Sequence, residues 1–173
     1  MQIEVREMTP DDWPAVREIY RRGIESGDAT FEREPPDWET WHARRHPKCR
    51  LVAECEETVV GFACVSATSE RAVYSGVCEI MVYVAEENRG HGIGGRLMAS
   101  LVSATEAQGI WTLESSIFPE NVASIRVHER VGFRVVGTRE RVGRFHDGRW
   151  RAPVLMGRRS SSTGLGCPPP SPA

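Results

Sequence analysis

Four glycines fall within six residues, between a predicted strand over residues 79–85 and a predicted helix from Gly92 to near Gly109. The stretch reads Arg89-Gly90-His91-Gly92-Ile93-Gly94-Gly95, and apolar residues at helical spacing follow it. Glycines let the backbone approach a ligand closely, and free N–H groups at a helix N-terminus attract anions. The loop therefore predicts a phosphate or pyrophosphate site. A flexible turn without a ligand is the alternative, although so many glycines are costly to order without a reason.

A dinucleotide-binding fold is a second interpretation of the same loop. Gly90, Gly92 and Gly95 satisfy the G-x-G-x-x-G pattern, and Glu114 follows about 20 residues later. The context argues against it, because residues 86–89 separate the strand from the first glycine. Upstream, residues 50–55 and 58–68 predict a hairpin, whereas a dinucleotide fold needs parallel units.

The remaining pattern predicts alternating strands and helices in one domain. Strands are expected over residues 2–8, 50–55, 58–68, 79–85, 111–118, 133–142 and 150–156, and helices over residues 9–23, from Asp37, and over 92–109 and 121–131. After Arg159 the chain turns to Ser, Gly and Pro. We therefore expect a folded domain over residues 1–159 and a disordered tail over 160–173.

Composition excludes several classes of function. The 173 residues carry 22 Lys and Arg against 24 Asp and Glu, so no excess charge favours nucleic acid or a membrane surface as a partner. No window approaches roughly 18 continuous apolar residues, and the N-terminus lacks a targeting pattern. The five cysteines form no CxxC pair, which is typical of reduced thiols. A cytoplasmic protein is therefore expected. No metal is expected either, since His42, His46 and His146 lack metal-ligand spacing.

Two motifs at their correct separation carry a family resemblance. Read as Arg89-x-x-Gly92-x-Gly94, the loop resembles the pyrophosphate loop of the GNAT superfamily of N-acetyltransferases. Residues 121–133, NVASIRVHERVGF, resemble the N-x-x-S-x-x-x-[HY]-E-x-x-G-F signature of that superfamily. The resemblance implies an α/β (α+β) GNAT fold, with a mixed, mostly antiparallel central sheet of about seven strands and helices on both faces.

Finer features resemble one branch of the superfamily. Glu79-Ile80-Met81-Val82-Tyr83-Val84, Pro119-Glu120-Asn121 and Gly148-Arg149-Trp150 look like the phosphinothricin and methionine sulfoximine acetyltransferases. That branch acetylates the α-amino group of small amino-acid analogues, and its members are usually cytosolic homodimers. The resemblance therefore implies acetyl-CoA as co-substrate, a small amine as acceptor and a homodimer.

The resemblance also implies where acetyl-CoA would lie. A splayed strand would pair through its backbone with the pantetheine arm, and the glycine loop would hold the pyrophosphate. For His91 the backbone N–H is the expected contact, ahead of the imidazole. Cofactor contacts are expected from Val82, Tyr83, Val84, Arg89, Gly90, His91, Gly92, Ile93, Gly94, Gly95, Asn121 and Ser124.

Acetyl transfer to an amine needs a base, an oxyanion-stabilising donor and a proton for the departing thiolate. Glu79 opens an apolar strand, where partial desolvation would raise its pKa, and it matches the glutamate that acts as base in the branch. A glutamate that merely faces solvent is the alternative. The oxyanion donor is expected to be a backbone N–H over residues 82–84.

The proton donor is expected to be His128. It falls where many members of the superfamily place a tyrosine beside the thioester sulfur, and helical spacing points it inward. Its near-neutral intrinsic pKa suits proton delivery. A buried, hydrogen-bonded core histidine is the alternative, and position alone does not separate the two.

The acceptor pocket is expected from two segments that match the branch: Phe31 with Glu32, and Tyr74 with Ser75 and Gly76. Two departures concern the substrate. Ser75 stands where an arginine or lysine would pair the substrate carboxylate, and either Arg71 or Arg33 could replace it. Residues 150–152, Trp-Arg-Ala, lack the carboxylate usual in Trp-x-Asp. The hypothesis is that the acceptor differs from phosphinothricin itself.

Three alternatives remain open from the sequence. Direct attack is favoured over an acetyl-cysteine, although Cys78 stands beside Glu79. A protein N-terminus or a lysine is the alternative acceptor. A non-catalytic acyl-CoA sensor, using the same loop without chemistry, is the alternative from another class.

Overall fold

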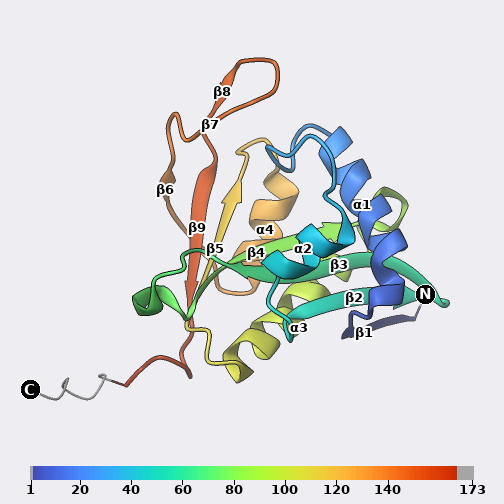
Figure 1. Cartoon of the computed structure of the whole chain (residues 1–173), viewed down its shortest axis with the longest axis horizontal. Helices are drawn as coiled ribbons and strands as arrows, with labels where there is room; N and C mark the ends of the chain where they lie inside the picture. The colour runs from blue at the N-terminus through green and yellow to red at the C-terminus, as the bar shows by residue number, and fades with distance from the viewer. Residues whose placement is uncertain (1, 167–173) are drawn as a thin grey trace, which may run out of the picture.

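One seven-stranded mixed sheet forms the centre of the molecule, and the computed structural model describes residues 2–166 (Figure 1). Neighbouring strands are antiparallel except β4 and β5, which are parallel. In spatial order the strands are β1 (Ile3–Glu7), β2 (Arg50–Cys55), β3 (Thr58–Ala67), β4 (Val77–Val84), β5 (Thr112–Ile117), β9 (Val154–Arg159) and β6 (Arg134–Thr138). The predicted mixed sheet of about seven strands is confirmed.

Helices cover both faces of the sheet, as predicted. The α-helices are α1 (Trp13–Glu25), α2 (Trp38–Arg44), α3 (Ile93–Ala107) and α4 (Val122–Arg130), and short 3₁₀ turns are η1 (Pro10–Asp12), η2 (Ala72–Tyr74) and η3 (Glu86–Asn88). One core lies under α3, and a second, rich in aromatic residues, lies under α1 and α2. Successive residues of β3, such as Phe62 and Ala63, enter different cores, because successive side chains of a strand point to opposite faces.

Helix starts follow local capping chemistry. The predicted Asp37 cap of α2 is confirmed, since the Thr40 N–H donates to its carboxylate at 2.7 Å. The first helix differs from its prediction: a 3₁₀ turn covers residues 10–12, and the α-helix runs from Trp13 to Glu25, two residues beyond Gly23. The Asp12 carboxylate accepts from the Thr9 N–H at 2.8 Å and holds this turn.

The C-terminal strands differ from the predicted pair over residues 133–142 and 150–156. β6 ends at Thr138 after a register shift between Val135 and Gly137, and β9 spans 154–159. Between them, β7 (Gly143–Arg144) and β8 (Trp150–Arg151) form a separate hairpin that projects past the end of the sheet (Figure 1). Pro153 separates β8 from β9, because it lacks the N–H that a continuous strand would donate.

The start of the predicted tail contacts the domain. The buried Ser160 hydroxyl donates to Glu106 at 2.8 Å, and the Thr163 hydroxyl donates to the Glu106 backbone carbonyl at 3.2 Å. The rest of that segment, including Cys167, lies outside the described residues, so the boundary at Arg159 stays a prediction. Within residues 2–166, no helix is both long enough and apolar enough to span a membrane.

Candidate active site

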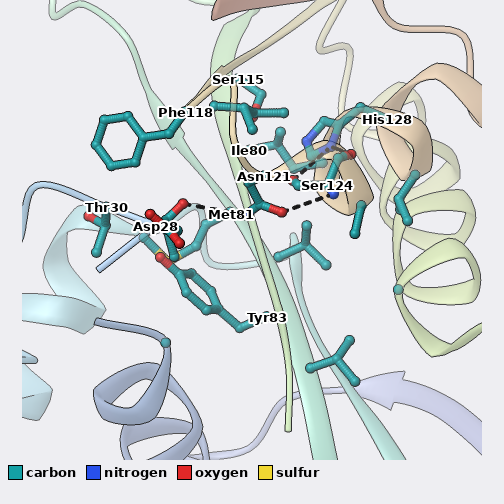
Figure 2. Close-up of a pocket in the computed structure, with 18 of the residues that line it drawn as sticks. Asp28, Thr30, Ile80, Met81, Tyr83, Ser115, Phe118, Asn121, Ser124 and His128 are labelled. Carbon is teal, nitrogen blue, oxygen red and sulfur yellow. Dashed lines mark hydrogen bonds between the residues drawn. The ribbon is translucent and has the colours of Figure 1, made fainter. Parts of the chain in front are cut away.

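An open cleft of about 890 Å³ lies where β4 and β5 separate. It is bordered by the loop after α1, by β4, by the glycine loop, by β5 and by the start of α4 (Figure 2). Most of the site residues predicted from the sequence border this one cleft.

The separation of β4 and β5 leaves two open backbone edges. The strands pair only from Val77 opposite Thr112 to Glu79 opposite Glu114, and β4 then continues to Val84. Beyond Glu79, the edge of β4 that faces β5 has no strand partner and can hydrogen-bond an extended ligand. The predicted residues Val82, Tyr83 and Val84 lie on this edge. The Tyr83 side chain stacks on Phe62, with ring centroids 5.4 Å apart, and lies among the side chains that line the cleft (Figure 2).

The glycine loop provides an anion site at the start of α3. Gly90 and Gly92 have φ of +82° and +77°, which L side chains rarely adopt, and Gly92 caps the helix. The first turn closes with the Arg96 N–H donating to the Gly92 carbonyl at 3.1 Å. The preceding N–H groups of Ile93, Gly94 and Gly95 have no helical acceptor and suit a phosphate. The loop therefore fits the pyrophosphate of a CoA thioester.

Side chains at this loop divide between cleft and core. Arg89 lines the cleft, and its Nε donates to the Val84 carbonyl at 3.4 Å. The Ile93 side chain is buried in the core, which leaves only its backbone for a ligand. His91 does not line the cleft, and its Nδ1 lies 3.3 Å from the Asn88 carbonyl oxygen. The expected contact between the His91 backbone N–H and the phosphate therefore stays a prediction.

Asn121 joins the two sides of the cleft. Its Oδ1 accepts from the Ser124 N–H at 3.1 Å and so caps α4 (Figure 2). Its Nδ2 donates to the Asp28 carbonyl at 3.4 Å, across the cleft on the loop after α1. Both predicted residues, Asn121 and Ser124, line the cleft.

His128 is 2% exposed and points inward, as helical spacing predicts. Its Nδ1 lies 2.8 Å from the Ser124 carbonyl oxygen, which can only accept, so Nδ1 carries the hydrogen. Desolvation by burial lowers the pKa of the imidazole, and the bond to Ser124 offsets part of this effect. The ring is therefore neutral near pH 7, and Nε2, which is buried without a hydrogen-bond partner, presents a lone pair. His128 also lines the cleft, so its role as proton donor stays a prediction beside the alternative of a hydrogen-bonded core histidine.

Glu79 lies at the fork of the two strands, open to the cleft. Enough protein surrounds its carboxylate that desolvation raises its pKa, and the nearby Glu114 adds to this effect, although Arg139 and Arg45 oppose it. Its alternate neighbours Met81 and Tyr83 share its face of β4, towards α1 and α2. A carboxylate with a raised pKa at such a fork suits a general base.

The loop after α1 forms one side of the cleft. Phe31 and Glu32, which are predicted to bind the acceptor, line the cleft there, and the Phe31 ring meets Phe118 edge to face at 4.9 Å. Arg151, from β8, donates to the Gly27 carbonyl at 2.7 Å and lies 3.7 Å over the Phe118 ring. The hairpin therefore braces this loop from outside.

Tyr74, Ser75 and Gly76 are not among the residues that line the cleft. They lie at the start of β4, where the strands are closed, and the Gly76 carbonyl accepts from the Trp111 N–H at 2.9 Å. The two substitutes considered for the substrate cation lie elsewhere too: Arg71 packs on Tyr74, and Arg33 borders a separate, smaller cavity. The acceptor pocket proposed below excludes these residues.

Four arginines line the cleft that the sequence analysis does not predict as site residues. Arg126 and Arg130 follow Asn121 on α4, and helical spacing from that cap could have found them. Arg44 and Arg45 end α2, and no local pattern connects them to the site. Within residues 2–166, no group of three or more His, Cys, Asp or Glu could hold a metal ion.

A sheet that opens beside a helix-capping glycine loop, with a carboxylate at the fork, defines an acyl-CoA-dependent acyltransferase. The comparisons agree with this class. The model of the acetyltransferase (GNAT) family matches residues 12–133, and the chain belongs to this family. It is an acetyl-CoA-dependent N-acetyltransferase.

Named relatives indicate which acetyltransferases of the family this chain resembles. The chain is 34% identical to phosphinothricin N-acetyltransferase of Alcaligenes faecalis, over 89% of this chain and 81% of that protein. It is 28% identical to L-methionine sulfoximine/L-methionine sulfone acetyltransferase of Pseudomonas aeruginosa, over 87% of this chain and 90% of that protein. The crystal structure of a phosphinothricin acetyltransferase from Sinorhizobium meliloti, in complex with acetyl-CoA, matches with a TM-score of 0.85 and 29% identity, over 99% of this chain and 95% of that one.

Proposed function

We propose that this enzyme acetylates the primary amine of a small amino-acid-like acceptor, with Glu79 as the general base. The observation that carries the proposal is the position of Glu79, a carboxylate of raised pKa at the point where β4 and β5 separate. Two relatives are named for acetylating phosphinothricin and methionine sulfoximine or sulfone, and these names support a small amino-acid-like acceptor.

Bound acetyl-CoA supplies an acetyl group activated as a thioester. The N–H groups at the start of α3 and the side chain of Arg89 would hold its pyrophosphate, and the open edge of β4 would pair with its pantetheine amides. A backbone N–H over residues 82–84 would stabilise the developing oxyanion. Glu79 would take a proton from the amine, directly or through water, as the new C–N bond forms and the C–S bond breaks. Solvent would then protonate the thiolate.

Direct attack by the amine is favoured over an acetyl-cysteine intermediate. Cys78 precedes Glu79 on β4, and its side chain therefore points to the opposite face, into the core under α3. Burial raises the pKa of its thiol, so little thiolate forms near neutral pH. The proposal therefore needs no covalent enzyme intermediate.

The test is thiol release from acetyl-CoA with a panel of amines that includes phosphinothricin, methionine sulfoximine, methionine sulfone and free amino acids. Glu79→Gln should lower kcat by about 10²- to 10⁴-fold and leave the Kd for acetyl-CoA unchanged, since it removes only the base. Glu114→Gln, which changes the carboxylate opposite it in register, should keep most of the turnover. Unchanged activity in Glu79→Gln would contradict the assigned base.

The acceptor is proposed to differ from phosphinothricin itself. Ala152 replaces a charged residue expected of that branch, with Arg151 beside it, and Ser75, the other departure from the branch, lies outside the cleft. The same panel decides this point, because phosphinothricin should give a lower kcat/KM than at least one other amino acid. Full activity on phosphinothricin would contradict it.

A homodimer in the cytoplasm completes the proposal. Val135 and Val136 are exposed on the outermost strand β6, and Trp150 is exposed on β8, which supports an association surface there. The four cysteines of the described residues are free and buried, which suits a reducing compartment. Sedimentation should show a dimer that Val136→Glu dissociates, and fractionation of cells should recover the activity in the soluble fraction.

A further inference from the structure

Arg45 is a cation in the cleft that forms no salt bridge with any of the described residues. It follows the last residue of α2, and its guanidinium lies between the Trp41 ring, 5.6 Å from the centroid, and the Met81 sulfur, 4.0 Å from Nη2. No carboxylate lies within salt-bridge distance of it among residues 2–166, and its buried Nε has no hydrogen-bond partner. A partly buried charge in this state is costly unless an anion joins it.

Arg45 faces the same part of the cleft as the proposed base. Glu79 and Met81 are alternate residues on one face of β4, roughly 7 Å apart along the strand. The guanidinium in contact with Met81 is close enough to the Glu79 carboxylate to lower its pKa. The cleft thus offers a negative group and a positive group on the same face of β4, the two charges that the ammonium and carboxylate of an α-amino acid require.

The other charged groups near Glu79 fit this role less well. Arg139 does not line the cleft, and its Nη1 donates to the Ser116 hydroxyl at 3.5 Å. Arg151, on the loop side, is already paired with Glu120 at 2.9 Å. Arg44 lines the cleft, but its helical position is exposed and it has no contact with β4 among the described hydrogen bonds.

We propose that Arg45 pairs with the α-carboxylate of the acceptor while Glu79 faces its amine, so that the enzyme selects free α-amino acids over peptides and simple amines. This inference rests on the proposed function. In it, Arg45 takes the place of the cation that the related enzymes are expected to carry at the position of Ser75. Arg45 is then a specificity-determining residue, and the guanidinium can hold the carboxylate through two N–H donors.

Binding separates this role from turnover. The Kd of L-methionine sulfone and of its carboxamide is measured by calorimetry on the full chain saturated with CoA, which cannot donate an acetyl group. The wild type should bind the acid about 10- to 100-fold more tightly than the amide, the range of a charge-assisted hydrogen-bonded pair. Arg45→Met should bring this ratio close to one by weakening only the acid, and Arg45→Lys should restore part of it.

Comparison variants and controls keep the test decisive. Arg71→Met removes a cation outside the cleft and should leave the ratio unchanged. Because the amide has a less basic amine, the informative quantity is the change of the ratio between proteins. Thermal unfolding and the Kd for acetyl-CoA check that each variant is folded, and Arg45→Lys serves as the test if Arg45→Met is not.

Each binding result either supports or overturns the role of Arg45. A wild type that binds acid and amide equally, or binds neither, overturns the role of Arg45, and so does an unchanged ratio in Arg45→Met or a ratio lost in Arg71→Met. A wild type that prefers the acid through Arg45 but releases no thiol from acetyl-CoA would overturn the proposed function and leave this inference standing.

Discussion

At the scale of single residues, the site depends on how burial treats two titratable groups in opposite ways. Burial raises the pKa of Glu79, which makes the carboxylate a better proton acceptor, and lowers the pKa of His128, which leaves less of the imidazole protonated. We therefore expect the acid–base chemistry of the cleft to depend on one carboxylate.

Glu79 should give the pH profile of kcat/KM an acidic limb. The base must be ionised, and because its pKa is raised above the ordinary 4.5, activity should fall as the pH drops through a value higher than that. Glu114→Gln removes a neighbouring like charge and should move the limb to lower pH. Initial rates in buffers of constant ionic strength measure this, and an identical limb in Glu79→Gln would assign it to another group.

His128→Leu should lower kcat by less than about tenfold, because a neutral imidazole whose only N–H is bonded to the Ser124 carbonyl has no proton to give from Nε2. Kinetics with the best acceptor and a thermal melt measure the two effects. A fall of about 100-fold or more, together with loss of an alkaline limb, would show instead that His128 is the proton donor predicted from the sequence.

At the scale of elements, the β7–β8 hairpin supports the loop after α1, which is proposed to bind the acceptor. Arg151, 17% exposed, joins the hairpin to Gly27 and Asp28 on that loop and to Glu120 before α4. Phe31 also packs against Gly143 of β7, where an added Cβ would lie 2.6 Å from the ring. The loop is thus positioned by chain that lies more than 100 residues later.

Arg151→Met should raise the KM for the acceptor about three- to tenfold, with the KM for acetyl-CoA unchanged, because it releases the loop and leaves the glycine loop untouched. Hydrogen exchange over residues 26–34 should become faster. Arg149→Met, in the same hairpin but paired only with Asp147, is the matched control. Equal effects of the two variants would show that the hairpin has no specific hold on the loop.

Local patterns predicted some elements, and tertiary contacts decided the others. The glycine loop, the Asp37 cap and the α4 motif were predictable, because glycine content, capping residues and helical spacing act within a few residues. The hairpin and the shift of β9 were not, since they depend on a bulge in β6 and on Pro153. Arg45 lines the cleft because of how α2 packs, and residues 74–76 lie outside it because β4 is paired with β5 at its start. No pattern in the neighbouring sequence indicates either position.

At the scale of the whole molecule, one arginine joins the first strand, the first turn and the second strand. Arg6 donates to Asp12 at 2.8 and 2.9 Å and to Glu54 at 2.6 Å. The hydrogen bonds from Arg6 hold the pKa of the buried Asp12 below its ordinary value. A carboxyl whose pKa is depressed on folding stabilises the protein fully above the unfolded pKa, near 3.8, and this contribution is lost as the pH falls further, through the lower pKa of the folded state.

Asp12→Asn should reduce the free energy of unfolding at pH 7 by about 1–3 kcal/mol, because it removes a charged acceptor from a buried network. The difference from the wild type should shrink as the pH falls below the ordinary pKa of an aspartate. Urea unfolding at several pH values measures both effects. Asp11→Asn, at the exposed neighbouring position of the same turn, should change little, and an equal loss there would contradict the explanation.

The two hydrogen bonds of Asn121 bear on the order in which substrates arrive. The amide group of Asn121 caps α4, beside the place proposed for acetyl-CoA, and also bonds to Asp28 on the loop proposed to bind the acceptor. A cofactor that fixes α4 would also fix that loop, so an ordered kinetic mechanism with acetyl-CoA first is expected. CoA should then inhibit competitively against acetyl-CoA and noncompetitively against the amine. Asn121→Ala should shift the mechanism from ordered towards random binding of the two substrates.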